Sequence, residues 1–236
     1  MSALLEVLAL HPADAQRAEE GGADRVQLVG SLTDAGMSPE PALVERVRDA
    51  TTIQVRVLLR LRDGFGTDGG EVTRLRGLAA SYVDAGADGI VMGFLNGHGD
   101  IDAEVLTAIL SEGEWPWTCH RAIDHALDTD RSWRTLQTLP RLDQVLTAGS
   151  ARDLEHGLDD LIARARADAA TAALIQAGGD LRPEHVPWLV RAGVRSFHIT
   201  SAARPLGSWK AYVDAGLVQA WRTLIDAETR HRPTTR

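Results

Sequence analysis

The sequence predicts an α/β fold, a single (β/α)8 or TIM barrel that spans residues 1–236. Three observations predict this class. Short apolar runs alternate with amphipathic stretches of helical length, and there are eight of each. The turns from helix to strand also have similar sequences in several repeats. No linker or low-complexity segment divides the chain. A doubly wound open sheet is the alternative for the same alternation.

The expected strands are apolar runs bounded by Gly, Asp or Pro, at residues 4–10, 25–29, 53–60, 89–92, 115–120, 144–147, 172–177 and 195–200. The expected helices follow them, at residues 12–20, 39–50, 71–85, 103–111, 131–139, 152–167, 183–192 and 208–230. Gly22, Gly86 and Gly193 end three of these helices, where a left-handed residue is favoured. Ser38 and Ser150 are the expected capping residues at two helix starts.

Charge and hydropathy exclude several functional classes. Acidic residues outnumber basic ones by 33 to 25, and no basic stripe interrupts this excess, so neither nucleic acid nor a membrane surface is an expected partner. The longest apolar runs, such as residues 89–95, are too short to span a bilayer. The N-terminus lacks the features of a signal peptide, which predicts a cytoplasmic protein.

Polar residues on the first and third strands are candidates for ligand binding, because barrel enzymes build their sites at the C-terminal ends of the strands. Glu6 interrupts an apolar run, so it needs a partner. Arg56, Arg60 and Arg62 share one face of the third strand and its extension. Arg56 has two interpretations, an ion pair with Glu6 or a contact with an anionic ligand. Arg60 and Arg62 are expected to bind the ligand.

The fifth strand ends in a group of ionisable residues. His120 is the candidate general acid or base, Asp124 and Glu6 are expected to orient the catalytic groups, and Arg121 is a third clamp for an anion. The alternative for His120 is a hydrogen-bonded structural histidine. Cys119 faces away from His120 along the strand, and a lone cysteine is typical of a small buried hydrophobe.

Small and hydroxylated residues follow the last three strands. Thr147, Gly178, Gly179, His198 and Ser201 are candidate contacts to phosphate or carboxylate. The alternative for the two glycines is a tight turn.

A glycine motif follows the third strand, at Gly64, Gly66 and Gly69. No acidic residue follows the next strand to hold a ribose, so a flexible barrel loop is expected and no nucleotide cofactor. The remaining histidines show no metal-ligand spacing and are expected at the surface or at helix caps: His11, His98, His125, His156, His185 and His231.

Several motifs together resemble the CutC family of copper homeostasis proteins. They are Leu5-Glu6-Val7, Arg60-x-Arg62, His120-Arg121-Ala122-Ile123-Asp124, Val145-Leu146-Thr147-x-Gly149 and His198-x-Thr200-Ser201. The resemblance runs from Leu4 to Ala203 and implies a cytoplasmic TIM barrel that forms a homo-oligomer. It also implies a link to copper, with Cys119, His120 and His198 as the ligands. Three departures from the family pattern stand out: no cysteine at residues 8–10, Gln27 in place of Glu, and Ala148 in place of Ser.

Two functional hypotheses follow. One is a CutC-like protein associated with copper homeostasis that carries an anion-binding pocket at the C-terminal face of the barrel. The other is a TIM-barrel enzyme that acts on a small phosphorylated or carboxylated metabolite without binding copper. A third class, a scaffold without catalysis, predicts that the charges at the strand ends neutralise one another.

Overall fold

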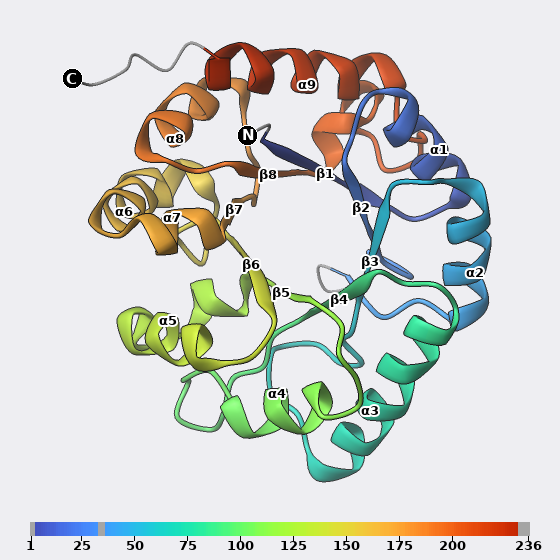
Figure 1. The fold of residues 1–236 in the computed structure, drawn as a ribbon, viewed down its shortest axis with the longest axis vertical. Helices are drawn as coiled ribbons and strands as arrows, with labels where there is room; N and C mark the ends of the chain where they lie inside the picture. The colour runs from blue at the N-terminus through green and yellow to red at the C-terminus, as the bar shows by residue number, and fades with distance from the viewer. Residues whose placement is uncertain (1–2, 33–35, 231–236) are drawn as a thin grey trace.

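The computed structural model describes residues 3–32 and 36–230, so His231 lies outside the described residues. Eight parallel strands close into a barrel in sequence order, and the helices surround it (Figure 1). This confirms the predicted fold class. The strands are β1 (Leu4–Ala9), β2 (Arg25–Leu28), β3 (Gln54–Leu58), β4 (Gly89–Met92), β5 (Trp117–Cys119), β6 (Leu142–Thr147), β7 (Ile175–Ala177) and β8 (Ser196–Ile199).

The outer ring consists of α1 (Pro12–Glu20), α2 (Pro41–Ala50), α3 (Gly69–Asp84), α4 (Ala103–Leu110), α5 (Thr129–Thr138), α6 (Leu154–Ala167), α7 (Ala169–Leu174), α8 (Val186–Ala192) and α9 (Ala215–Arg230). Short 3-10 turns lie between them: η2 (Arg121–His125), η3 (Pro183–His185), η4 (Ser201–Ala203) and η5 (Pro205–Gly207). Among the described residues, no helix combines the length and apolar character needed to cross a membrane.

Two predicted elements differ from the structure. The first half of the strand expected at residues 172–177 belongs to helix α7, because the Asp168 carboxylate caps this helix by accepting from the amides of Ala170 and Thr171. The helix expected at residues 208–230 begins only at Ala215. The chain before it forms η4 and η5 instead, and the buried ion pair between Arg204 and Asp14 fixes this segment against α1.

The helix ends predicted at glycines are confirmed, whereas the capping of helix starts predicted for Ser38 and Ser150 is wrong. Gly193 takes the left-handed conformation after α8, with φ of 107°. Ser38 does not cap α2; its hydroxyl accepts from the amide of Arg60 at 2.8 Å. Asp153, not Ser150, caps α6 by accepting from the amide of His156 at 3.0 Å.

The barrel separates two hydrophobic clusters. Outward-facing strand residues pack with the inner faces of the helices in the large cluster, and Leu8, Val29, Leu58 and Val91 form a small one inside the barrel. Strand register sets the interior layers, each built from alternate strands. From the N-terminal end, they are Arg25, Gly89, Gln144 and Ser196; then Glu6, Arg56, Thr118 and Gln176; then Gln27, Val91, Leu146 and His198; then Leu8, Leu58, His120 and Gly178.

These layers change from polar to apolar along the barrel axis. Branched aliphatic side chains usually fill a TIM barrel. Here the two layers nearest the N-terminal end are polar, and the aliphatic residues begin one layer above them. The polar groups therefore lie directly beneath the strand ends where a barrel places its site.

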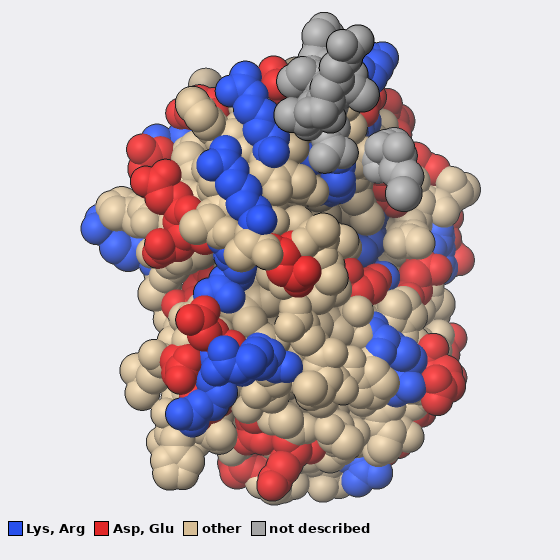
Figure 2. Space-filling view, turned by 60° about the vertical axis from the view of Figure 1, so that its left-hand side comes forward, with Lys and Arg blue, Asp and Glu red and all other residues tan. Residues whose placement is uncertain are grey.

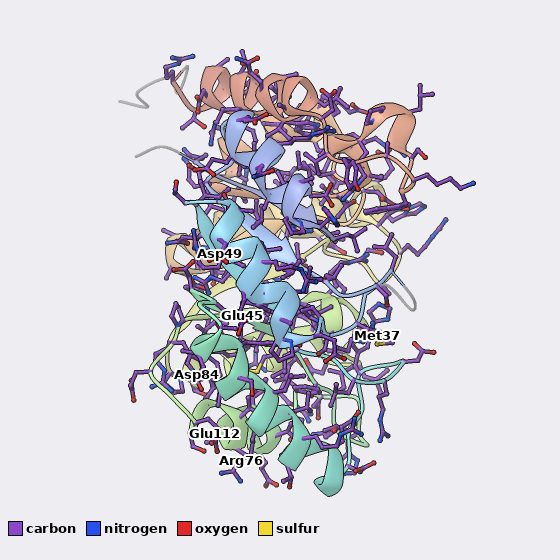
Figure 3. All side chains as sticks on the ribbon, turned by 90° about the vertical axis from the view of Figure 1, so that its right-hand side faces the viewer. Met37, Glu45, Asp49, Arg76, Asp84 and Glu112 are labelled. Atoms are coloured by element: carbon purple, nitrogen blue, oxygen red, sulfur yellow. The ribbon has the colours of Figure 1, made fainter. Side chains whose placement is uncertain are left out.

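The two ends of the barrel are distinguished in the side view. Met37 follows β2 and lies at the end where the strands terminate, while Asp49, Asp84 and Glu112 lie at the opposite end, where helices α2, α3 and α4 terminate (Figure 3). On the face turned toward the viewer in Figure 2, basic side chains lie in short groups next to acidic ones.

Candidate active site

A cavity of about 500 Å³ opens at the C-terminal ends of the strands. Five predicted site residues line it: Arg60, His120, Arg121, Gly179 and His198. Leu8, Leu58 and Leu146 supply apolar surface, and Phe65 and Trp209 supply aromatic surface. A concave, mostly apolar cavity with a few convergent polar groups is the usual form of a small-molecule site.

Glu6 lies fully buried beneath this cavity and has partners on three strands. Its carboxylate forms an ion pair with Arg25, accepts from Gln176 Nε2 at 2.8 Å and lies 2.7 Å from His198 Nδ1. Burial alone would raise its pKa, but Arg25 and the hydrogen bond to His198 outweigh burial and lower the pKa to about 2. Glu6 is therefore ionised in the folded protein.

The predicted pairing of Glu6 with the arginines of the third strand is wrong. Register places Arg25 beside Glu6, while Arg56 lies beside Gln27 and reaches toward the N-terminal end of the barrel to bind Asp143. Arg62 lies beyond the end of β3 and is half exposed, bound to Asp68 and Glu71. Neither Arg56 nor Arg62 lines the cavity.

His198 and Glu6 form a carboxylate–histidine pair at the base of the cavity. Because Glu6 is ionised, the proton between the two groups belongs on Nδ1 of the imidazole. In that tautomer Nε2 carries the lone pair, and His198 lines the cavity in which a ligand would bind. The arrangement is that of a general base whose orientation is fixed by a carboxylate.

In His120 the hydrogen-bonding roles of the two ring nitrogens are reversed. Its Nδ1 accepts from the amide of Ala122 at 3.1 Å, so a neutral ring carries its proton on Nε2. Burial, followed by the positive charge of Arg60, lowers the pKa of His120 to about 3. The predicted acid/base titration near neutral pH is therefore wrong. His120 presents an N–H donor in its place, as a neutral electrophilic imidazole does.

Arg60 and Arg121 bring two cationic side chains to the cavity wall. Arg60 donates to the carbonyls of Gly64 and Gly36, both at 3.1 Å, and Arg121 donates to the carbonyl of Ser150 at 2.9 Å. These carbonyl oxygens orient both guanidinium groups, and Arg121 is also ion-paired with Asp124. Burial, followed by the positive charge of Arg121, lowers the pKa of the neighbouring His125.

Asp124 orients Arg121 rather than His120. Its buried carboxylate accepts from Arg121 Nε at 2.8 Å, from the amide of Ala148 at 2.9 Å and from the hydroxyl of Thr147. The predicted roles of Asp124 as a catalytic group and of Thr147 as a ligand contact are therefore replaced by positioning, since neither residue lines this cavity.

The remaining glycines and Ser201 have structural roles. A Cβ at residue 178 would lie 2.5 Å from Leu146 Cδ1, so Gly178 permits close packing behind the cavity. Gly179 permits Arg121 to lie against the backbone, with its Cζ 3.0 Å from where a Cβ would be. Ser201 lines a separate surface hollow, and its neighbour Thr200 lines the cavity.

Sequence reasoning missed Arg25 and Gln176 as parts of the site and identified Gln27 only as a departure from the family pattern. Each is a polar residue inside an apolar strand, and the alternation of strand side chains could have placed all three inside the barrel. His125 is exposed, as expected, and it also lines the rim of the cavity, where its ring is tilted against Phe65 with 4.8 Å between ring centroids. Nothing in the local pattern signals that contact.

The donor set does not fit the Cu(I) site that the family resemblance implies. Cys119 is buried in the large hydrophobic cluster outside the barrel, its thiol donates to the carbonyl of His120, and burial raises its pKa. Cu(I) favours thiolate ligands. Among residues 3–32 and 36–230, no three His, Cys, Asp or Glu residues are grouped so that they could hold a metal.

Comparisons with known proteins agree with the fold and its motifs. The model of the CutC family matches residues 3–203. A CutC family protein of Klebsiella pneumoniae is 32% identical over 212 residues, covering 88% of this chain and 81% of the relative. A CutC family protein of Xanthomonas axonopodis is 34% identical over 200 residues, covering 84% of this chain and 82% of the relative.

Solved structures show the same fold. A Streptococcus agalactiae CutC protein that carries a copper-homeostasis name superposes with a TM-score of 0.75 at 21% identity, covering 83% of this chain and 97% of that one. A thiamine phosphate pyrophosphorylase of Pyrococcus furiosus gives 0.56 at 15% identity and 96% coverage of both chains. With the family model across most of its length and relatives above 30% identity, this chain belongs to the CutC family.

Proposed function

We propose that the cavity binds a small anionic metabolite and catalyses a proton transfer in it, with His198 as the base and Glu6 as the group that orients it. The observation that carries this proposal is the ionised, buried Glu6 held 2.7 Å from His198 Nδ1 at the base of a 500 Å³ cavity. A pair that served only the stability of the fold would not need a histidine that lines an open cavity.

The charges around the cavity support an anionic ligand. Arg60 and Arg121 both line the cavity; Arg60 donates to the carbonyls of Gly64 and Gly36, and Arg121 is ion-paired with Asp124 and donates to the carbonyl of Ser150. His120 adds an uncharged N–H donor. Phosphate and carboxylate are the groups that such arginine and N–H donors bind. A copper function gains no support from these residues, because the one thiol lies outside the cavity.

The test is a titration with inorganic phosphate and with malonate, followed through the ring-nitrogen signals of the histidines by NMR. We expect both anions to shift the signals of His120 and His198 and to leave the exposed His156 unchanged. The Arg121→Met variant should weaken the effect, while Arg62→Met is the matched control, since Arg62 lies outside the cavity. Anions that shift none of the cavity histidines would exclude the proposal.

The role of His198 as the proton-accepting base requires a second measurement. The ring-nitrogen signals of His198 should report the proton on Nδ1, and Glu6→Leu should change that tautomer because it removes the acceptor of this proton. If the tautomer is the same in Glu6→Leu, Glu6 does not orient His198.

A further inference from the structure

Two buried polar atoms of the cavity wall have no hydrogen-bond partner among the described residues. They are Oε1 of Gln27 and Nε2 of His120. Both side chains are more than nine-tenths buried and both line the cavity. Buried polar groups in native proteins are almost always paired, so unpaired ones that line a cavity indicate where a ligand binds.

The two atoms differ in what they require. Nε2 of His120 donates, because Nδ1 already accepts from Ala122 and burial keeps the ring neutral. Oε1 of Gln27 accepts. A carboxylate or a fully ionised phosphate alone offers only acceptors and would leave Oε1 of Gln27 unpaired. A carbonyl beside a hydroxyl satisfies both, with the carbonyl oxygen on His120 and the hydroxyl on Gln27.

The positions of Gln27 and His120 in the barrel place a ligand that binds both of them next to His198, the proposed base. Gln27 and His198 belong to one interior layer, on the two strands that flank β1, while His120 enters from β5 in the layer above. A ligand that bonds both Gln27 and His120 therefore spans the cavity, with its hydroxyl end on the side of His198. The carbon that carries this hydroxyl is then the one that His198 Nε2 can reach.

We propose that the substrate is a small phosphorylated or carboxylated α-hydroxy carbonyl compound, and that the site interconverts its two carbonyl isomers. The inference rests on the proposed function and names its substrate class. His198 Nε2 takes the proton from the carbon that bears the hydroxyl. The electron pair of that C–H bond forms a C=C bond, and the carbonyl pair moves to its oxygen, which His120 Nε2–H stabilises.

The second half of the reaction returns the proton. The hydroxyl proton of the enediolate passes to the other oxygen, and protonated His198 gives its proton to the carbon that was the carbonyl carbon. One C–H bond breaks and one forms, so the step requires no oxidant, reductant or cofactor. Ionised Glu6 stabilises the positive charge that His198 carries between the two transfers.

The experiment follows exchange of carbon-bound protons for deuterium by NMR in D2O. Dihydroxyacetone phosphate, erythrulose 4-phosphate and ribulose 5-phosphate are the probes, and acetol phosphate, which has the carbonyl and the phosphate without the hydroxyl, is the control compound. We expect the native protein to exchange the proton beside the carbonyl in at least one ketose phosphate, and to act more slowly on acetol phosphate.

The variants assign the exchange to the site. His198→Asn should slow it by at least about 100-fold, and His120→Gln should slow it with a smaller change in binding. Gln27→Leu should remove the preference for the hydroxylated probes. His156→Gln, an exposed histidine on α6, should behave as the native protein does. Thermal unfolding of each variant shows whether it is folded.

The outcomes separate this inference from the proposed function. Probes that bind and shift the histidine signals without any exchange would overturn the substrate class and leave the anion site standing. Exchange that is equally fast in native protein and His198→Asn would come from a contaminating isomerase and would also overturn the inference. If no phosphate compound binds, the proposed function fails as well.

Discussion

Arg204 and Asp14 form an ion pair in which both side chains are at most 2% exposed, with Nη2 of the arginine 2.9 Å from Oδ2 of the carboxylate. Asp14 lies in the first helix, and its carboxylate also accepts from the amides of Leu10 and Val213. Arg204 packs over the ring of Trp209, which lines the cavity. The pair therefore fastens the segment after β8 to the start of the barrel and holds one wall of the site.

Breaking this pair should be costly. Arg204→Met leaves a buried carboxylate without its cation, and we expect the free energy of unfolding to fall by about 3–5 kcal/mol. Asp14→Leu should have a similar effect. The double variant should lose less than the sum of the two, because neither charge is then left alone. Urea unfolding of the four proteins measures this; strictly additive losses would show that the two residues do not interact.

Gly179→Ala should weaken both stability and anion binding. Gly179 has φ of 85°, and a Cβ there would lie 3.0 Å from Arg121 Cζ, so the substitution strains the backbone and displaces the guanidinium. We expect a loss of about 1–3 kcal/mol in the free energy of unfolding. Phosphate titration of the variant measures the second effect.

Gly193→Ala is the matched control for that experiment. Gly193 also has positive φ, 107°, but it follows α8 at the opposite end of the barrel, and a Cβ there meets Ala172 Cβ at an ordinary 3.4 Å. It should lose stability and keep phosphate affinity. Equal affinities in the two alanine variants would mean that Gly179 does not position Arg121.

Stability should depend on pH through His120. Its folded pKa of about 3 lies below the unfolded value of 6.5, so between these pH values the unfolded chain binds a proton that the folded protein does not. The free energy of unfolding then falls by about 1.4 kcal/mol for each pH unit of acidification. His120→Gln should remove this contribution between pH 6.5 and 4.5.

Glu6 adds to the same trend at lower pH. Its folded pKa of about 2 lies below the unfolded 4.5, so its stabilising effect is complete above pH 4.5 and is lost as the pH falls toward 2. Urea unfolding at pH 7, 6 and 5 isolates His120 from Glu6. Parallel slopes for native protein and His120→Gln over this range would contradict a neutral buried His120.

Cys119 should be unreactive in the folded protein. It is fully buried, and its raised pKa keeps it a thiol, so a disulfide reagent such as Ellman's should label it only after unfolding. For the same reason we expect a chromogenic Cu(I) chelator to compete successfully against the native protein and against Cys119→Ala alike. Stoichiometric Cu(I) retention that is lost in Cys119→Ala would restore a copper site at this residue.

Much of the fold follows from local patterns. Eight apolar runs with helical stretches between them predict the barrel, and the strand alternation predicts which side chains of β3 and β5 share a face. Glycines after helices predict left-handed ends, as at Gly193. These features depend on neighbours within a few residues, so the sequence contains all the information that they need.

The partners of the site residues depend on how the barrel closes. Glu6 meets Arg25 because the stagger of the strands sets that register, and it meets His198, 192 positions away, because β8 closes on β1. His120 appears from sequence to be a titrating acid/base, but burial beside Arg60 makes it a neutral donor. The sequence by itself determined most of the strands and helices and the candidate polar residues. Tertiary structure decided which of them pair and which protonation state each holds, because desolvation and distance between remote segments set both.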